Sequence, residues 1–161
     1  MPLEPDALTE FVERLTADQH RWRHLVRHAE DVRVYEQIWD DDHINAWVIC
    51  WSEDQDTGFH DHDASSAAIG VISGHVREER LRLGARPSAR VLGPGSTFTV
   101  PAAAIHRVLH AGADPAVTIH AYSPPLARTG AYRFGANGEI LRDAVSIDEE
   151  LRAAPALADA A

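Results

Sequence analysis

The chain has 161 residues and a formal net charge of −10, from 25 acidic and 15 basic residues. This length suits a single domain with an adequate core, and the negative charge argues against a nucleic-acid partner, because phosphates bind basic surfaces. No apolar run approaches the roughly 20 residues of a membrane span. Because the single cysteine, Cys50, cannot form an internal disulfide and residues 1–6 lack signal-peptide features, we expect a cytoplasmic protein, and a monomer.

The N-terminal segment, residues 1–30, is predicted to be helical. Its apolar residues recur at helical spacing: Leu8, Phe11, Val12 and Leu15. Asp18 is expected to begin a second helix that carries Trp22, because aspartate is a favoured residue at helix N-termini. Three histidines of that second helix, His20, His24 and His28, are interpreted as part of its polar outer face.

From Val32 onward the hydrophobic pattern has a period of two, which is typical of strands. Strands are predicted at residues 32–39, 44–51, 67–73, 75–83, 96–100, 108–111, 116–122, 132–134 and 140–145, with loops at 52–58 and 84–89. Short strands at this spacing predict an all-β barrel or sandwich over residues 31–145. Residues 146–161 are expected to add a short acidic helix, capped by Ser146, and a frayed tail, all within one domain.

The segment His60-Asp61-His62 is the strongest functional signal in the chain. On a strand, His60 and His62 would point to the same face, because side chains alternate. His106, on a neighbouring predicted strand, would supply a third imidazole to one metal ion. Three protein ligands leave coordination positions open, which a catalytic metal requires. Asp61 and Asp63 would point to the opposite face and support the loop.

The spacing around these histidines matches the two cupin motifs. In the first, His60-x-His62 is followed by Ala67, where the usual acidic ligand would stand, and then by Gly74. In the second, Gly95 is followed after five residues by Pro101 and then by His106. Both segments occur in the expected order on a β-rich chain, so the prediction is a metal site of three histidines without a carboxylate.

Over residues 35–138 the chain resembles the cysteine dioxygenase family, the thiol dioxygenases of the cupin superfamily. The residues that carry the resemblance are Ile49-Cys50-Trp51, His60-Asp61-His62, Ile105-His106-Arg107-Val108 and Thr118-Ile119-His120-Ala121-Tyr122-Ser123-Pro124-Pro125. The resemblance implies an all-β cupin β-barrel (jelly roll) with a short N-terminal helical layer. It also implies Fe(II) bound by His60, His62 and His106, and oxidation of a small thiol to its sulfinic acid with O2.

Thr118, His120 and Tyr122 share one face of a predicted strand, because they alternate. The resemblance implies that they correspond to a Ser-His-Tyr trio of the family, with Thr118 in place of the serine. Tyr122 would then contact substrate or oxygen, and His120 would orient Tyr122. Ala67 stands where animal members have a cysteine that cross-links to the tyrosine, so no such cross-link is expected here.

The substrate end is assigned to Gln37, Tyr35 and Ala67. Gln37 stands where cysteine dioxygenases have a carboxylate-binding arginine, and its amide offers neither the charge nor the paired donors of a guanidinium. L-Cysteine, 3-mercaptopropionate and ergothioneine therefore remain open as substrates, and Arg128 or Arg133 could supply a cation instead. The alternatives to a thiol dioxygenase are a non-catalytic ligand-binding cupin, a metal-dependent isomerase and another cupin oxygenase.

Overall fold

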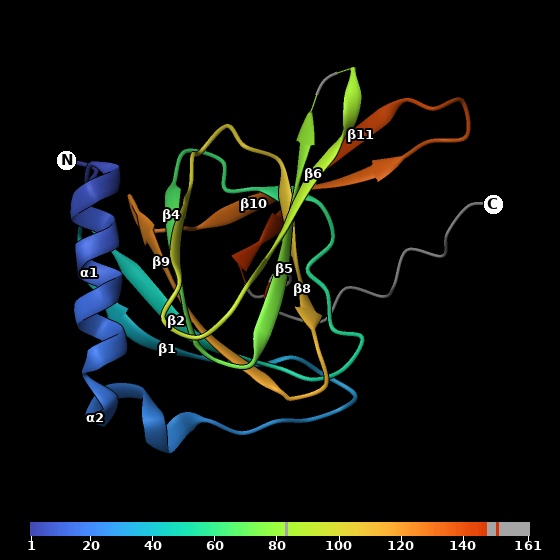
Figure 1. Ribbon diagram of the computed structural model, residues 1–161. Helices are drawn as coiled ribbons and strands as arrows, with labels where there is room; N and C mark the ends of the chain where they lie inside the picture. Colours follow the sequence, from blue (N-terminus) through green and yellow to red (C-terminus); the bar gives the residue numbers. More distant parts are fainter. Residues whose placement is uncertain (83, 148–150, 152–161) are drawn as a thin grey trace.

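The computed structural model describes residues 1–82, 84–147 and 151. Figure 1 shows a strand-rich molecule with its helices on one side. The elements are α1 (Pro5–Ala17), α2 (Gln19–Trp22), the 3-10 turn η1 (Arg23–Leu25), β1 (Val34–Asp40), β2 (Asn45–Trp51), β3 (His60–Asp61), β4 (Ser66–Ser73), β5 (His75–Arg82), β6 (Ala85–Leu92), β7 (Thr97–Val100), β8 (His106–Ala111), β9 (Ala116–Ser123), β10 (Arg128–Phe134) and β11 (Ile140–Ser146).

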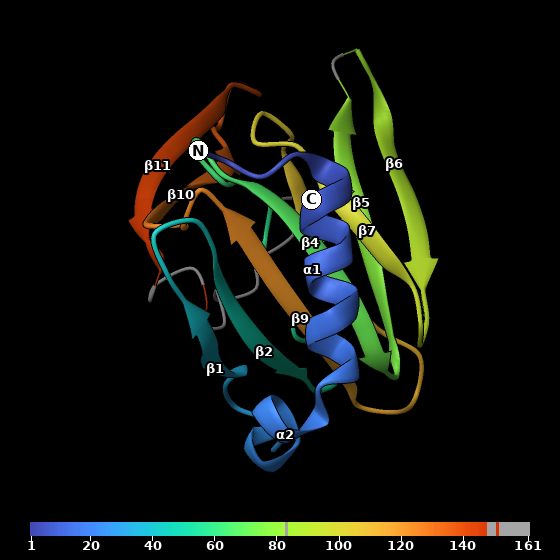
Figure 2. The ribbon, with the colours of Figure 1, turned by 90° about the vertical axis from the view of Figure 1, so that its left-hand side faces the viewer.

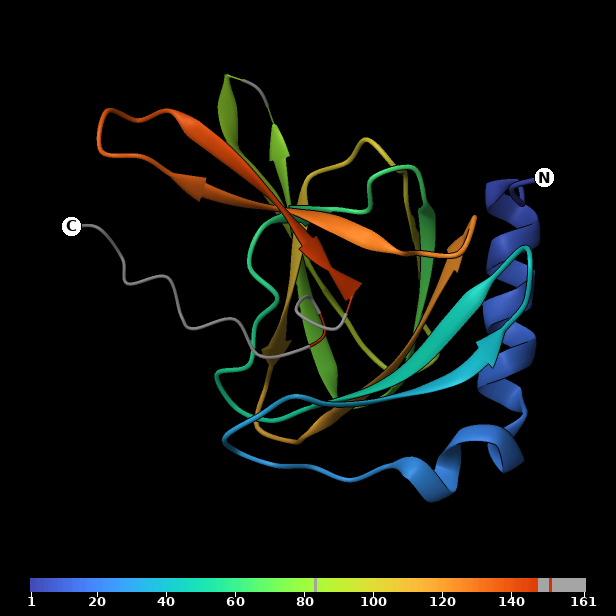
Figure 3. The ribbon, with the colours of Figure 1, turned by 180° about the vertical axis from the view of Figure 1, so that it is seen from behind.

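The strands form two antiparallel sheets that face each other (Figure 3). One sheet has the order β1-β2-β9-β4-β7 and the other β11-β10-β3-β8-β5-β6. This arrangement confirms the predicted all-β jelly roll. Across the described residues the two sheets remain separate layers, so the structure is a sandwich and not one closed barrel.

Helix α1 covers the outer face of the five-stranded sheet, where it lies across β4 and β9 (Figure 2). Leu8, Val12 and Leu15 of α1 are buried against that sheet. The helix approaches β4 closely at Gly70, where an added β-carbon would lie 2.9 Å from the Val12 side chain. The predicted helical layer is therefore confirmed, and no helix in the described ranges is long and apolar enough to span a membrane.

The central strands of the sheet beneath α1 are apolar because both faces of that sheet are covered. Every residue of β2 and of β9 is buried, because α1 covers one face and the second sheet covers the other. Strands buried on both faces read as near-continuous apolar runs. The inner core between the sheets contains Trp47, Ile49, Trp51 and Tyr122, and the candidate site opens into this core.

The helical prediction over residues 5–30 was too long. The chain leaves the helical conformation at Asp18, and helical structure ends at Leu25. The Trp22 side chain is buried, and its indole N–H donates to the Leu15 carbonyl oxygen at 3.1 Å, so the second helix folds back against the end of α1. Beyond Leu25 the chain continues without helix to β1.

The predicted loop at residues 84–89 was wrong, because most of it belongs to β6. Pro87 is tolerated there because β6 is the edge strand of its sheet, where one row of N–H groups needs no partner. The pairing with β5 also shifts register between Arg80 and Arg82, opposite the proline. The predicted helix after Ser146 falls mostly on residues 148–150, which lie outside the described residues together with the tail from 152 to 161.

Candidate metal centre

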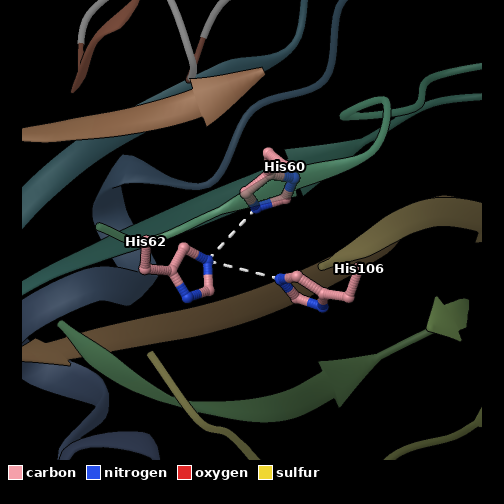
Figure 4. A group of neighbouring side chains, drawn as sticks. All are labelled: His60, His62 and His106. Atoms are coloured by element: carbon pink, nitrogen blue, oxygen red, sulfur yellow. Dashed lines mark hydrogen bonds between the residues drawn. The ribbon is translucent and has the colours of Figure 1, made fainter. Parts of the chain in front are cut away.

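Two of the three histidines lie opposite each other on neighbouring strands. His60 of β3 pairs with His106 of β8, and His62 follows β3 directly. All three side chains are buried and converge, as Figure 4 shows. The Nε2 atom of His62 lies 3.1 Å from that of His60 and 3.3 Å from that of His106. Within the described ranges this is the one group of three or more potential ligands gathered within 4.8 Å.

The donor set suits a metal ion. His60 Nδ1 lies 3.0 Å from the Gly58 carbonyl oxygen, and His106 Nδ1 lies 3.3 Å from Glu78 Oε1. Both acceptors require the proton on Nδ1, so the Nε2 lone pairs of these two rings point to a common centre. The Nε2 separations are those of nitrogens that share one ion at about 2.1 Å.

The electrostatic surroundings favour the neutral forms of His62 and His106. Burial, followed by the neighbouring histidines, holds the pKa of His62 and of His106 well below the usual 6.5. A neutral imidazole is the form that binds a metal. Ala67 is fully buried on β4. It occupies the position at which the first cupin motif usually has an acidic ligand, so a methyl group replaces a carboxylate there. The cluster thus offers three imidazole nitrogen donors and no carboxylate.

Asp61 points away from the cluster and is held by the hairpin of β10 and β11. Arg142 donates from Nε and Nη2 to the two carboxylate oxygens at 2.8 and 2.9 Å. Tyr132 donates its hydroxyl to Asp61 at 2.6 Å, and the Gly130 N–H donates at 3.2 Å. A β-carbon at position 130 would overlap the Arg142 guanidinium, so glycine is required for this approach. The network holds the residue between the two histidines in place.

The charge of Asp61 is stabilised despite its burial. Burial alone would raise the pKa of this carboxyl group. The hydrogen bonds from Arg142, Tyr132 and the Asp63 backbone outweigh that effect and hold the pKa well below its usual 3.8. Asp63 itself pairs with Arg128, whose Nε lies 2.9 Å from the Asp63 carboxylate. Both aspartates therefore contact the β10–β11 hairpin and not the histidine cluster.

Glu78 is a residue that the sequence analysis did not single out. Its side chain is 1% exposed, and it accepts hydrogen bonds from Arg80 at 2.8 Å and from Arg90 at 2.7 Å. The same carboxylate contacts His106 Nδ1 and so orients the ring, as carboxylates commonly do behind metal-bound histidines. The sequence carried one signal for Glu78. In the alternating pattern of β5 it falls on the same buried face as Val76.

The three predicted residues of β9 form a buried chain of hydrogen bonds. His120 Nδ1 lies 3.2 Å from the Tyr122 hydroxyl oxygen, and His120 Nε2 lies 2.9 Å from Thr118 Oγ1. The Tyr122 ring packs edge-on against His62, with 5.0 Å between the ring centroids. Ala67 lies directly opposite Tyr122 on the neighbouring strand β4. The structure therefore brings the trio and Ala67 beside the histidine cluster.

The predicted substrate end is less enclosed. Tyr35 and Gln37 lie on β1 opposite Ile49 and Trp47, so they share the inner face of the sheet. Tyr35 is half-buried and packs against the inner core, whereas Gln37 is exposed at the rim.

The two candidate arginines of the sequence analysis are engaged elsewhere. Arg128 pairs with Asp63, and Arg133 pairs with Asp143 at 2.9 Å. Both ion pairs are exposed and belong to the β10–β11 hairpin. Neither guanidinium is brought to the histidine cluster by these contacts.

Comparison with solved structures places the fold in the cupin class. A Klebsiella pneumoniae protein with a double-stranded β-helix domain aligns with a TM-score of 0.55 at 15% identity, over 74% of this chain and 91% of that one. A cupin superfamily protein from Desulfitobacterium hafniense aligns with a TM-score of 0.55 at 12% identity, over 64% of this chain and 87% of that one. The protein thus has a cupin-type fold with an inward-facing cluster of three histidines.

Sequence comparison narrows the class to one family. The family described as cysteine dioxygenase type I matches residues 4–134, and the chain belongs to that family. Cysteine dioxygenase type 1 of Danio rerio is 28% identical over 92 residues, which are 51% of this chain and 46% of that protein. The matched region thus spans about half the length of this curated relative.

We expect Glu78→Gln to weaken metal binding about 10- to 100-fold, because the neutral amide orients and polarises His106 less well. Competition between the apoprotein and a chelator for Co(II) measures the affinity. Glu79→Gln is the matched control, because Glu79 also pairs with two arginines, Arg77 and Arg107, but makes no contact with His106. Equal losses in the two variants would contradict a specific role for Glu78.

We expect Asp61→Asn to lower the free energy of unfolding by about 2 kcal/mol, because it weakens a buried, charge-assisted network. Asp143→Asn, on the same hairpin, breaks the exposed pair with Arg133 and should cost less than about 0.5 kcal/mol. Urea denaturation of both variants tests the difference. A loss at Asp61 no larger than that at Asp143 would show that the network does not hold the metal-site segment.

Proposed function

We propose that this protein is a non-haem, Fe(II)-dependent thiol dioxygenase that oxidises a small thiol to its sulfinic acid. The balanced reaction adds both atoms of O2 to the thiol sulfur, so RSH and O2 give RSO2H. The observation that carries the proposal is the convergence of three imidazoles, without a carboxylate, beside the Tyr122–His120–Thr118 chain. Membership of the cysteine dioxygenase type I family supports the same reaction.

His60, His62 and His106 are the proposed iron ligands. When bound, Fe(II) supplies an undiminished double positive charge and open positions at which a thiolate and O2 can lie side by side. The protein's part is to orient the imidazoles toward a common centre. Gly58 and Glu78 hold the Nδ1 protons of two of the rings, and the buried site excludes bulk water.

Tyr122, His120 and Thr118 are the proposed catalytic trio. Tyr122 lies beside His62 and is oriented by His120 through its hydroxyl group. The proposed role of its hydroxyl is to bond a ligand atom at the metal site. Ala67, opposite Tyr122, leaves the ring without a thioether partner, so any fixation of the phenol comes from hydrogen bonding and packing.

The substrate is proposed to be L-cysteine or a related small thiol. Tyr35, Gln37 and Ala67 would line its binding site. An amide at Gln37 favours a thiol with a weaker demand for a cationic anchor, such as 3-mercaptopropionate, or a thiol that is itself cationic, such as ergothioneine. The ion pairs made by Arg128 and Arg133 support this view, because those guanidinium groups already bind aspartates.

Oxygen uptake by the Fe(II)-reconstituted protein tests the function. We expect O2 consumption with at least one of L-cysteine, 3-mercaptopropionate and ergothioneine, and the matching sulfinate by mass spectrometry. His106→Ala should abolish uptake together with iron binding. Iron binding without oxidation of any thiol would instead favour the non-catalytic ligand-binding cupin, and a protein that retains no iron would refute the metal assignment.

We expect Gln37→Arg to raise kcat/KM for L-cysteine relative to the other two thiols by about 10-fold or more, because a guanidinium adds a charge-assisted bond to the carboxylate. Gln19→Arg is the matched control, since it adds an exposed cation on α2, outside the proposed substrate site. An unchanged ranking of the thiols in the Gln37 variant would remove this residue as the selector.

A further inference from the structure

Trp51 makes a hydrogen bond that extends the catalytic trio by one residue. It is fully buried at the end of β2, and its indole Nε1–H donates to Thr118 Oγ1 at 2.8 Å. We propose that Trp51 is a positioning residue that sets the direction of the hydrogen bonds along Thr118 and His120, so that the Tyr122 hydroxyl acts as a donor at the metal site. The inference deepens the proposed function and rests on it for the identity of the ligand that Tyr122 meets.

The direction follows from what each group can do. An indole N–H can only donate, whereas a threonine hydroxyl donates one hydrogen and accepts others. Trp51 and His120 are the two side chains bonded to Thr118 Oγ1, and Thr118 is fully buried. The hydroxyl hydrogen cannot point at another donor, so it points to His120 Nε2. The opposite arrangement would leave a buried hydroxyl hydrogen without an acceptor, which is costly.

The bond from Thr118 determines the tautomer of His120. With Nε2 as the acceptor, the neutral ring carries its proton on Nδ1. Burial, followed by the charge of Arg33, lowers the pKa of His120 to about 3, so the ring is neutral. Nδ1–H then donates to the Tyr122 oxygen 3.2 Å away. The phenol oxygen is an acceptor in this bond, and its own O–H acts as a donor on the side of the histidine cluster.

Trp51 is held firmly enough to serve as the start of this chain. The Arg33 guanidinium lies over the indole, 5.0 Å from the ring centroid. Arg33 is itself buried and donates to the backbone carbonyls of Leu151 at 3.1 Å and Asp56 at 3.0 Å. A cation over the face of an indole ring is attracted to it, so Arg33 stabilises this orientation of the Trp51 ring. The buried indole is therefore held by Arg33 over its ring and by the hydrogen bond from its N–H to Thr118.

The consequence concerns which ligand atoms the site accepts. A tyrosine that donates favours a ligand that presents a lone pair or negative charge to it, such as an oxygen atom or a carboxylate. A tyrosine that used its hydrogen on His120 would favour a donor instead. The direction of one buried chain of hydrogen bonds therefore selects the ligand chemistry at the metal centre.

The test is the tautomer of His120 in the full-length, metal-free protein labelled with 15N-histidine. Two-dimensional spectra that correlate ring nitrogens with ring protons distinguish a protonated Nδ1 from a protonated Nε2. His120→Gln identifies the signal by its loss. We expect the proton on Nδ1 near neutral pH. A proton on Nε2 in the unmodified protein would overturn the inference, whatever the activity of the iron-loaded protein.

Trp51→Phe tests the positioning role directly, because it keeps a ring beneath Arg33 but removes the N–H. The Thr118 hydroxyl hydrogen can then turn toward the phenyl ring at position 51, which leaves the Thr118 oxygen free to accept from His120 Nε2. We therefore expect His120 to populate both tautomers. Trp22→Phe is the matched control, since it removes another buried indole that donates one hydrogen bond, far from Thr118. An unchanged His120 spectrum in the Trp51 variant would overturn the assignment.

Thr118 provides a second route should the Trp51 variant not fold. Thr118→Val removes the donor to Nε2 and should also release the tautomer, whereas Thr118→Ser should preserve it. In the iron-loaded protein, Trp51→Phe should lower kcat for oxygen uptake about five-fold, equivalent to about 1 kcal/mol, with a smaller change in KM. Because the tautomer is read without iron, failure of this inference and failure of the proposed function are distinguishable.

Discussion

The hydrogen-bond network around the buried carboxylate of Asp61 is the interaction on which the rest of the site depends. It lies between two of the proposed ligands, and alternation along the strand sends it outward while the two imidazoles point inward. A buried carboxylate without partners would be strongly unfavourable. The two donors of Arg142 and the Tyr132 hydroxyl remove that penalty, and they do so from a different hairpin. The metal-site segment and the C-terminal hairpin are therefore stabilised together.

Throughout the site, the acidic side chains are bound by their own partners and do not point into the centre of the histidine cluster. The acids near the cluster lie behind or outside it: Asp61 faces the β10–β11 hairpin, and Glu78 lies behind His106 with two arginines. The three side chains that face the centre are imidazoles, and none of them is a carboxylate. Because no ligand charge offsets the metal, a bound divalent ion would attract an anion, and a thiolate is such an anion. Charge placement thus links the burial of the acids to the proposed preference for a thiol.

Periodicity predicted much of this architecture. The all-β barrel or sandwich, the helical layer and most strands follow from patterns within ten residues, and the three histidines are recognisable from spacing. The jelly roll was implied by the resemblance to the family. Glu78 and Trp51 could not be assigned in this way, because their partners are set by the register of β5 with β8 and of β2 with β9. The error at β6 has a related cause. Propensity disfavours Pro87 in a strand, but an edge position leaves its missing N–H without consequence.

The residue proposed to select the thiol lies in a different kind of structure from the residues proposed to oxidise it. The proposed ligands and the trio lie on strands of two facing sheets, or in the case of His62 directly after one, and all are buried, so their neighbours determine their positions. Gln37 lies on edge strand β1, exposed, next to a register shift between Gln37 and Trp39. An edge strand with a bulge can change its side chains and their aim without disturbing the core. We infer that this arrangement would let the proposed reaction centre serve different thiols, with selection at the rim and oxidation in the buried interior.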